Sequence, residues 1–160
     1  MAVVVGPADW WVATPGALNS LAIACPVGTV LPDGSVSICK AGGTVWIIAP
    51  ISTEASQSWN NNSASLVGNK PCVSDWPTVC SKMITSGFNP SDWCIPSASN
   101  LNNPGYICRS RWDSFTATSY WSSTETSASN ACRQNFSDGA LVGIAKTNSF
   151  NVRAFRTVNY

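Results

Sequence analysis

Histidine is absent from this chain of 160 residues, which restricts the chemistry that its side chains can perform. Without an imidazole there is no Ser-His-Asp or Cys-His nucleophilic site and no ordinary histidine-ligated zinc site. Eight carboxylates remain as candidate acids and bases: Asp9, Asp33, Glu54, Asp75, Asp92, Asp113, Glu125 and Asp138. A hydrolase that uses two of them would need a pair that meets only in space, and the sequence leaves that chemistry open. Since Asp33 and Asp138 precede glycine in turns and Asp75 suits the first turn of a helix, we expect no enzymatic activity.

Seven cysteines are the next chemical feature. Such a number usually indicates disulfides and an oxidising compartment, but an odd count leaves at least one thiol unpaired or shared between chains. No C-x-x-C pair occurs, so a zinc site made of cysteines alone is poorly supported. The carbohydrate-type calcium motif and the Gly-rich phosphate loop are absent as well, and we read Glu125 and Asp92 as buried or hydrogen-bonded structural acids. We therefore expect no metal and no cofactor.

Charged residues are scarce and nearly balanced, with nine Lys and Arg against eight Asp and Glu and a net charge of +1. A polyanion binds through many phosphate contacts, so nucleic acid is not an expected partner. The arginines form small local groups at Arg109 and Arg111, at Arg133, and at Arg153 and Arg156. Folding could gather them into an anion-binding patch, although pairing with a nearby acid or covering of apolar surface is the commoner outcome for arginine.

We expect residues 1–40 to form an apolar arm of irregular or short-stranded structure, because Gly and Pro interrupt this stretch repeatedly. Its apolar groups need burial against the rest of the domain or against another subunit, and we expect them to drive assembly into a homotrimer. The expected assembly residues are Val3, Val4, Val5, Trp10, Trp11 and Leu21. No Lys or Arg precedes Lys40, which argues against a signal peptide. The chain also lacks a run of about 20 apolar residues, so we expect neither a membrane span nor a membrane partner.

Residues 41–160 are predicted to form one domain, whose core most of the eight tryptophans would fill. Residues 44–49 are a β-branched run typical of a central strand, and residues 56–70 form a polar stretch expected to be an exposed loop. Residues 74–87 predict an amphipathic helix that Ser74 caps, and Ser97 can cap a shorter one. Antiparallel strands are expected near residues 119–124, 131–136, 141–146 and 151–157, with a hairpin turn at 137–139.

Motif blocks in the C-terminal part of the chain resemble a known family. They are Trp93-Cys-Ile-Pro-Ser97, Tyr120-Trp-Ser-Ser-Thr-Glu125, Ala131-Cys-Arg-Gln-Asn-Phe136, Asp138-Gly139, Lys146 and Val152-Arg-Ala-Phe-Arg156. Over roughly residues 90 to 157, this pattern resembles the C-terminal domain of an Lcl-type collagen-like bacterial adhesin and of many phage-encoded surface proteins. The resemblance implies an α+β, C-type lectin-like fold, mainly antiparallel sheet with one or two packed helices and long loops, used for display and binding.

The resemblance also implies a place on the virion surface for a protein that is made in the host cytoplasm. We therefore expect a non-enzymatic phage virion surface protein, namely a capsid decoration (cement) protein or a short head fibre, whose partners are other copies of itself and other virion proteins. The alternative is a host-recognition adhesin or tail fibre tip that binds a glycan or an anionic surface polymer. Fibre tips usually carry a repetitive stalk, and no such repeat occurs in this chain.

Lectin-like folds present irregular loops from a rigid sheet, so we expect any ligand to meet the loops at residues 60–70 and 100–113. Trp112, Arg109 and Arg111 are the candidate contact residues, because an aromatic ring beside guanidinium groups suits sugar faces or anionic polymers. The alternative places Trp112 in the core with both arginines paired internally, which is the commoner fate of tryptophan. Cys108 and Cys132 each lie beside an arginine at the edge of a motif block of the resembling family, and we predict that they form a disulfide.

Overall fold

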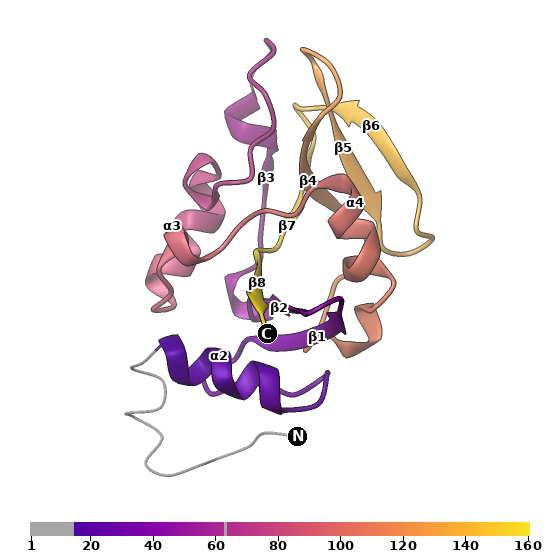
Figure 1. The fold of residues 1–160 in the computed structure, drawn as a ribbon. Helices are drawn as coiled ribbons and strands as arrows, with labels where there is room; N and C mark the ends of the chain where they lie inside the picture. The colour runs from indigo at the N-terminus through magenta and orange to yellow at the C-terminus, as the bar shows by residue number, and fades with distance from the viewer. Residues whose placement is uncertain (1–14, 63) are drawn as a thin grey trace.

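The computed structural model describes residues 15–62 and 64–160 (Figure 1). Helices and two separate β-sheets are mixed along the described chain, which confirms the predicted α+β class. The smaller sheet has the strand order β1-β2-β8 and lies beside α2, and the larger has the order β3-β7-β4-β5-β6. The chain reaches the small sheet early and returns to it only with its last strand, so segments far apart in the sequence complete one sheet.

The small sheet is built on a hairpin of β1 (Val36–Ala41) and β2 (Thr44–Ile48), to which β8 (Phe155–Asn159) adds antiparallel. Gly42 and Gly43 form the turn with φ angles of 57° and 77°, a backbone region that favours glycine. The prediction of a central strand over residues 44–49 is confirmed, because β2 lies between the other two strands.

The large sheet contains five strands, one of which joins its neighbour in parallel. These strands are β3 (Ala55–Ser58), β4 (Ser119–Glu125), β5 (Asn130–Asn135), β6 (Leu141–Ala145) and β7 (Ser149–Val152), with β4 and β7 parallel. The predicted hairpin at residues 137–139 is confirmed, since β5 and β6 pair antiparallel around Gly139 with φ 83°. The single strand predicted over residues 151–157 is wrong, because β7 ends at Val152 in the large sheet and β8 begins at Phe155 in the small sheet.

Within the described residues, three α-helices and several short helical segments lie before and between the strands. The α-helices are α2 (Pro15–Ala24), α3 (Pro77–Thr85) and α4 (Ala98–Asn100). The shorter turns are η1 (Ile51–Thr53), η2 (Trp59–Asn62), η3 (Val73–Asp75), η4 (Pro90–Asp92), η5 (Leu101–Tyr106) and η6 (Arg109–Arg111). Ser97 caps α4 as predicted, accepting a bond from the Asn100 N–H at 3.2 Å. Ser74 does not cap α3, because it lies in the separate turn η3 and the helix begins at Pro77.

The structure places residues 15–41 in the same packed body as the rest of the described chain, so the expected arm boundary at residue 40 is not seen. α2 packs on β2 and β8, and β1 is part of the small sheet. Leu21, predicted to be an assembly residue, is half-buried against the domain's own core. The other predicted assembly residues, Val3, Val4, Val5, Trp10 and Trp11, lie outside the described residues.

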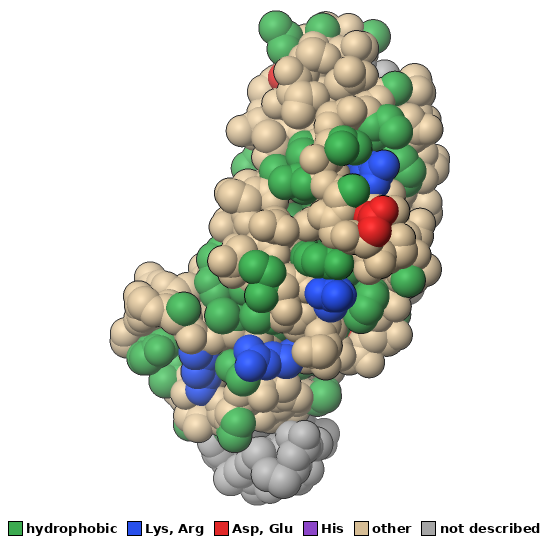
Figure 2. All heavy atoms as spheres, turned by 90° about the vertical axis from the view of Figure 1, so that its right-hand side faces the viewer, with side chains coloured by type: hydrophobic (Ala, Val, Ile, Leu, Met, Phe, Trp, Pro, Cys, Tyr) green, Lys and Arg blue, Asp and Glu red, His purple; other side chains and the backbone are tan. Residues whose placement is uncertain are grey.

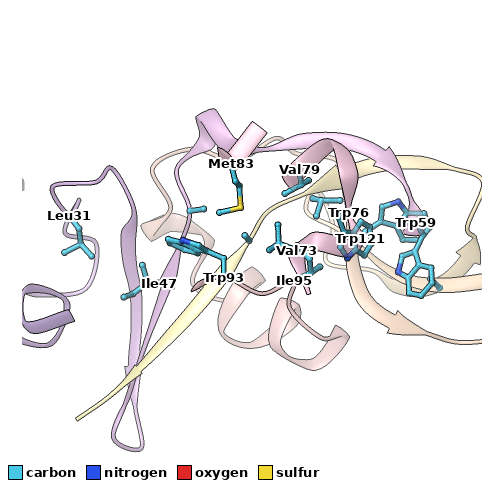
Figure 3. Close-up of a cluster of buried hydrophobic side chains, with 14 of the residues drawn as sticks. Leu31, Ile47, Trp59, Val73, Trp76, Val79, Met83, Trp93, Ile95 and Trp121 are labelled. Atoms are coloured by element: carbon cyan, nitrogen blue, oxygen red, sulfur yellow. The ribbon is translucent and has the colours of Figure 1, made fainter. Parts of the chain in front are cut away.

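Two buried clusters form the core. The first is an elongated band that runs from Leu31 and Ile47 at the small sheet to Trp59 at the large sheet (Figure 3). Trp59 lies inside the stretch predicted to be an exposed loop, yet it is fully buried and donates its ring N–H to Ser122 O at 2.9 Å. The second cluster gathers Trp112, Tyr120 and Phe136 with Phe155 and Ile38. Both clusters draw on both sheets, so each cluster packs the two sheets against one another.

Candidate functional site

Trp112, predicted to be a contact residue, belongs to the core. It is 6% exposed, and its ring packs edge-on against Tyr120 and Phe155 with ring centroids 5.8 and 5.7 Å away. The guanidinium of Arg153 lies over the same ring at 5.2 Å. This arrangement matches the alternative that we weighed from the sequence, in which Trp112 is a core residue and offers no face to a ligand.

Arg109 and Arg111, the other predicted contact residues, lie on η6 and bind the chain itself. Arg109 donates to Tyr106 O at 2.9 Å and stacks on the Tyr106 ring at 3.9 Å from its centroid. Arg111 donates to Ile38 O at 3.2 Å while its residue remains exposed. Figure 2 shows separate basic side chains in the lower half of one face, with neutral and hydrophobic side chains between them. The structure therefore does not bring Trp112 and the two arginines together as one binding platform.

Arg153, from the last motif block, is a buried structural cation. Its Nε donates to Ala49 O at 2.7 Å, and its NH1 donates to Glu54 at 2.8 Å. Its NH2 bonds to Asp113, and both terminal nitrogens reach Ser114 O at 3.1 Å. These partners come from two segments far apart in the chain, residues 49–54 and residues 113–114. The guanidinium therefore connects the β7–β8 junction to both segments. The same partners explain why no continuous strand passes through residue 153.

Lys146 is a second buried cation, and Glu125 is its partner. The Lys146 Nζ donates to Glu125 Oε2 at 2.6 Å and to Ala128 O at 2.8 Å. Glu125 also accepts the backbone N–H groups of Val67 and Gly68 at 3.0 and 2.9 Å. The hydrogen bond from Lys146, followed by the one from Val67, lowers the pKa of Glu125 below its ordinary value. The prediction that Glu125 is a hydrogen-bonded structural acid is therefore confirmed.

An open cleft of about 700 Å³ lies where four segments meet. One wall consists of Leu18 and Asn19 of α2 together with the loop before β1. The facing wall consists of residues 86–89 after α3 and the start of the following segment at Asp92 and Trp93. Arg156 and Thr157 of β8 line it between these walls. No sequence motif marks this site, because its residues come from four separate stretches of the chain, and we did not predict it.

Arg156 is the central charged group of the cleft. Its NH1 donates to Asn19 Oδ1 at 2.7 Å, and its guanidinium carbon lies 5.3 Å from the centre of the Trp93 ring. Phe88 supports that ring edge-on at 5.7 Å. Burial lowers the pKa of Arg156, whereas the nearby carboxylates oppose this shift, and an arginine stays charged at neutral pH in any case. The ring stack and the amide together fix the direction in which this cation points.

Two carboxylates accompany Arg156, so the charged groups of the cleft sum to a negative value. Asp33 and Asp92 both line it and both interact electrostatically with Arg156. Asp33 also holds the turn before β1, since its Oδ1 accepts from Ser35 N at 3.0 Å and from Ser35 Oγ at 2.5 Å. Asp92 is exposed on η4, so the expectation that it is a buried or hydrogen-bonded structural acid does not match its position in this cleft.

Cys108 and Cys132, which we predicted to form a disulfide, are both free thiols in the structure. Cys132 is buried on β5 beside Ser122, whose hydroxyl donates to Cys132 O at 2.7 Å. Cys108 interacts instead with Cys39 on β1.

Over residues 15–62 and 64–160, no group of three or more Cys, Asp or Glu gathers where it could hold a metal ion. Within the same ranges, we find no helix with both the length and the apolar character that a membrane crossing requires. A comparison with known proteins found no matching family model and no matching curated protein. The cleft chemistry is therefore the main guide to function.

Proposed function

We propose that this chain is a non-enzymatic surface protein of a phage particle, and that the cleft between α2, α3 and β8 binds a neutral glycan. The cleft carries the proposal because it is open and because its lining includes polar groups of several kinds. It offers a guanidinium at Arg156, carboxylates at Asp33 and Asp92, and amides at Asn19 and Asn89. Sugar hydroxyls both donate and accept hydrogen bonds, so a mixed set of this kind matches them.

The charge of the cleft selects among the possible ligands. Two carboxylates against one guanidinium disfavour an anionic polymer, which would meet like charge on both walls. A neutral polyhydroxylated ligand meets no such cost and can still accept a charge-assisted bond from Arg156. The cleft thus supports the glycan form of the adhesin alternative over its anionic-polymer form.

A binding role fits the cleft better than a catalytic one. Hydrolysis of a glycosidic bond needs two carboxyl groups on either side of the scissile bond, each free to exchange a proton. Asp33 is instead engaged by Ser35 in the turn before β1. The buried cations Arg153 and Lys146 are likewise committed to partners that hold the fold together. These commitments support a protein that displays a surface and does not turn over a substrate.

The place on the particle is supported by the resemblance of the motif blocks to phage surface proteins. Under this proposal the protein is a capsid decoration protein or a short head fibre, assembled with its own copies and with other virion proteins, and it meets neither nucleic acid nor membrane. A tail fibre tip is the second candidate, and the glycan-type cleft favours it. Protein identification on purified particles, followed by antibody labelling and imaging, separates head from tail. Absence of the chain from purified particles would contradict both locations.

The ligand proposal is tested by glycan-array binding of the purified full chain. Asp92→Asn keeps the shape of the side chain and removes its charge, and Arg156→Gln removes the cation. We expect each variant to weaken binding to the selected neutral glycan by about 10-fold or more, the loss associated with one hydrogen bond to a charged group. Asp138→Asn is the matched control, because Asp138 is exposed in the β5–β6 turn and the amide keeps the oxygen that accepts from Ala140 N. Equal binding by all four proteins would reject the cleft as the site.

A further inference from the structure

Cys72 and Cys94 face each other across an antiparallel backbone bridge. The N–H of Ile95 donates to Pro71 O at 2.7 Å. This hydrogen bond joins the residue before Cys72 to the residue after Cys94, and not the two cysteines themselves. That pattern defines a non-hydrogen-bonded pair, in which the two Cα atoms lie about 4.5 Å apart and the side chains are at their closest. A disulfide needs a Cα separation of about 4.4 to 6.8 Å, so the backbone already meets this requirement.

The position of Cys94 is fixed from its other side as well. Its N–H and C=O both bond to Phe155 of β8, each at 2.8 Å. Both cysteines are exposed, and Cys94 lines a small hollow of about 290 Å³ together with Pro71. Burial and then the neighbouring Cys72 raise the pKa of the Cys94 thiol, which agrees with two sulfur atoms at close range. The pair is therefore rigid, close and open to a small reagent.

Cys39 and Cys108 are a second pair of neighbouring cysteines. Both side chains pack against the second buried cluster, and Arg111, three residues after Cys108, donates to Ile38 O beside Cys39. Burial, followed by the neighbouring Cys108, raises the pKa of the Cys39 thiol. The guanidinium of Arg111 lies 3.8 Å from the Cys108 sulfur and can stabilise a thiolate there. Cys39 belongs to β1, and Cys108 precedes η6, so a bond between them would join the small sheet to the segment before β4.

We propose that a disulfide oxidant of the glutathione type converts these two pairs into the disulfides Cys72–Cys94 and Cys39–Cys108. The thiolate of one cysteine attacks the sulfur–sulfur bond of the oxidant, forms a mixed disulfide and releases one glutathione thiolate. The partner thiolate then attacks the mixed disulfide and releases the second glutathione. The two cysteines lose two electrons and two protons, and the oxidant leaves as two thiols. Cys25, Cys80 and Cys132 remain reduced.

The Cys72–Cys94 bond would close a loop that contains η3, α3 and η4. This loop supplies one whole wall of the cleft, from residue 86 to Trp93. Oxidation therefore joins the two ends of the loop that carries that wall, and neither cysteine is among the residues that line the cleft. The disulfide proposal rests on the cysteine geometry alone, and it stands or falls independently of the glycan proposal.

The first test is peptide mapping of the purified full chain without reductant. The protein is incubated with oxidised glutathione at low protein concentration, the remaining thiols are alkylated, and the linked peptides are identified by mass spectrometry. We expect four of the seven cysteines to resist alkylation and two linked peptides that join residue 72 to 94 and residue 39 to 108. Other linkages, a stable glutathione adduct or a chain-to-chain dimer in place of these links would overturn the proposal.

The second test uses serine variants and a thermal readout. In the wild type, reductant should lower the midpoint of thermal unfolding by on the order of 5–10 °C for each closed loop of this length. Cys72→Ser and Cys94→Ser should each remove the part due to their pair and expose the partner thiol to alkylation. Cys80→Ser is the matched control, since Cys80 on α3 lies inside the loop and is free. If reductant shifts the wild type no more than it shifts Cys72→Ser and Cys94→Ser, the Cys72–Cys94 bond does not form.

Discussion

Arg153 and Arg156 are near neighbours in the chain, but they occupy two different kinds of surroundings. Arg153 lies between the two sheets, 2% exposed, with two carboxylates and two backbone carbonyls around its guanidinium. Arg156 lies half-buried in the cleft, where it stacks on Trp93 and binds the amide of Asn19. The donors of Arg153 are all bonded to groups of the protein itself, whereas Arg156 lines an open cleft. Burial of the donors, and not the residue type, separates a structural cation from a candidate ligand contact.

The largest expected effect is at Arg153. Arg153→Met keeps much of the apolar stem but removes the counter-ion of the buried Glu54 and of the more exposed Asp113. Removing one partner of a buried ion pair costs about 3–5 kcal/mol, so we expect a loss of this size in the free energy of unfolding by chemical denaturation. Arg156→Met is the matched substitution and should cost about 1 kcal/mol or less. Equal losses for the two variants would break the distinction between them.

The Lys146–Glu125 pair should respond to acid. Because the folded state lowers the pKa of Glu125, its carboxylate stabilises the protein at pH values above its ordinary value of 4.5. That contribution is lost as the pH falls through the lowered folded value, where the carboxylate becomes protonated. We expect the thermal midpoint of the wild type to drop in this acid range. Glu125→Gln should be less stable at neutral pH and should lack this part of the acid dependence, and a parallel pH profile in the variant would contradict the assignment.

The smallest expected effect on stability, with a clear effect on binding, is at the cleft. Arg156→Lys keeps the positive charge but loses the planar group that stacks on Trp93 and reaches Asn19. We expect the thermal midpoint to stay within about 2 °C of the wild type, as for most partly exposed substitutions. Glycan affinity should fall several-fold, measured by titration calorimetry with the glycan selected on the array. If the Arg156→Lys variant keeps its glycan affinity, a positive charge at this position is sufficient for binding and the fixed orientation of the guanidinium is not needed.

The features that the sequence predicted correctly are local. The central strand β2, the Ser97 cap and the turn at Gly139 each follow from the types and spacing of a few adjacent residues. Hydrogen bonds and side-chain burial within such a stretch decide its structure, so neighbouring residues carry the signal.

The features that were missed depend on distant partners. The break between β7 and β8 exists because Arg153 turns toward Glu54 and Asp113, which no local pattern records. In the same way, the cleft and the Cys72–Cys94 pair arise only when separate segments meet. The α2 helix was missed because its apolar residues are not arranged with a clear helical period, so packing on β2 and β8 stabilises it.

The division of residues 149–159 between two sheets has a consequence for folding during synthesis. β2 is made early, but its second neighbour β8 leaves the ribosome only after the whole large sheet has been made. Until then one edge of β2 lacks its hydrogen-bond partner, and the surrounding core is open to other chains. The high sequence separation of this pairing predicts slow completion of the fold, so a nascent chain that stalls before β8 would be a natural substrate for chaperones.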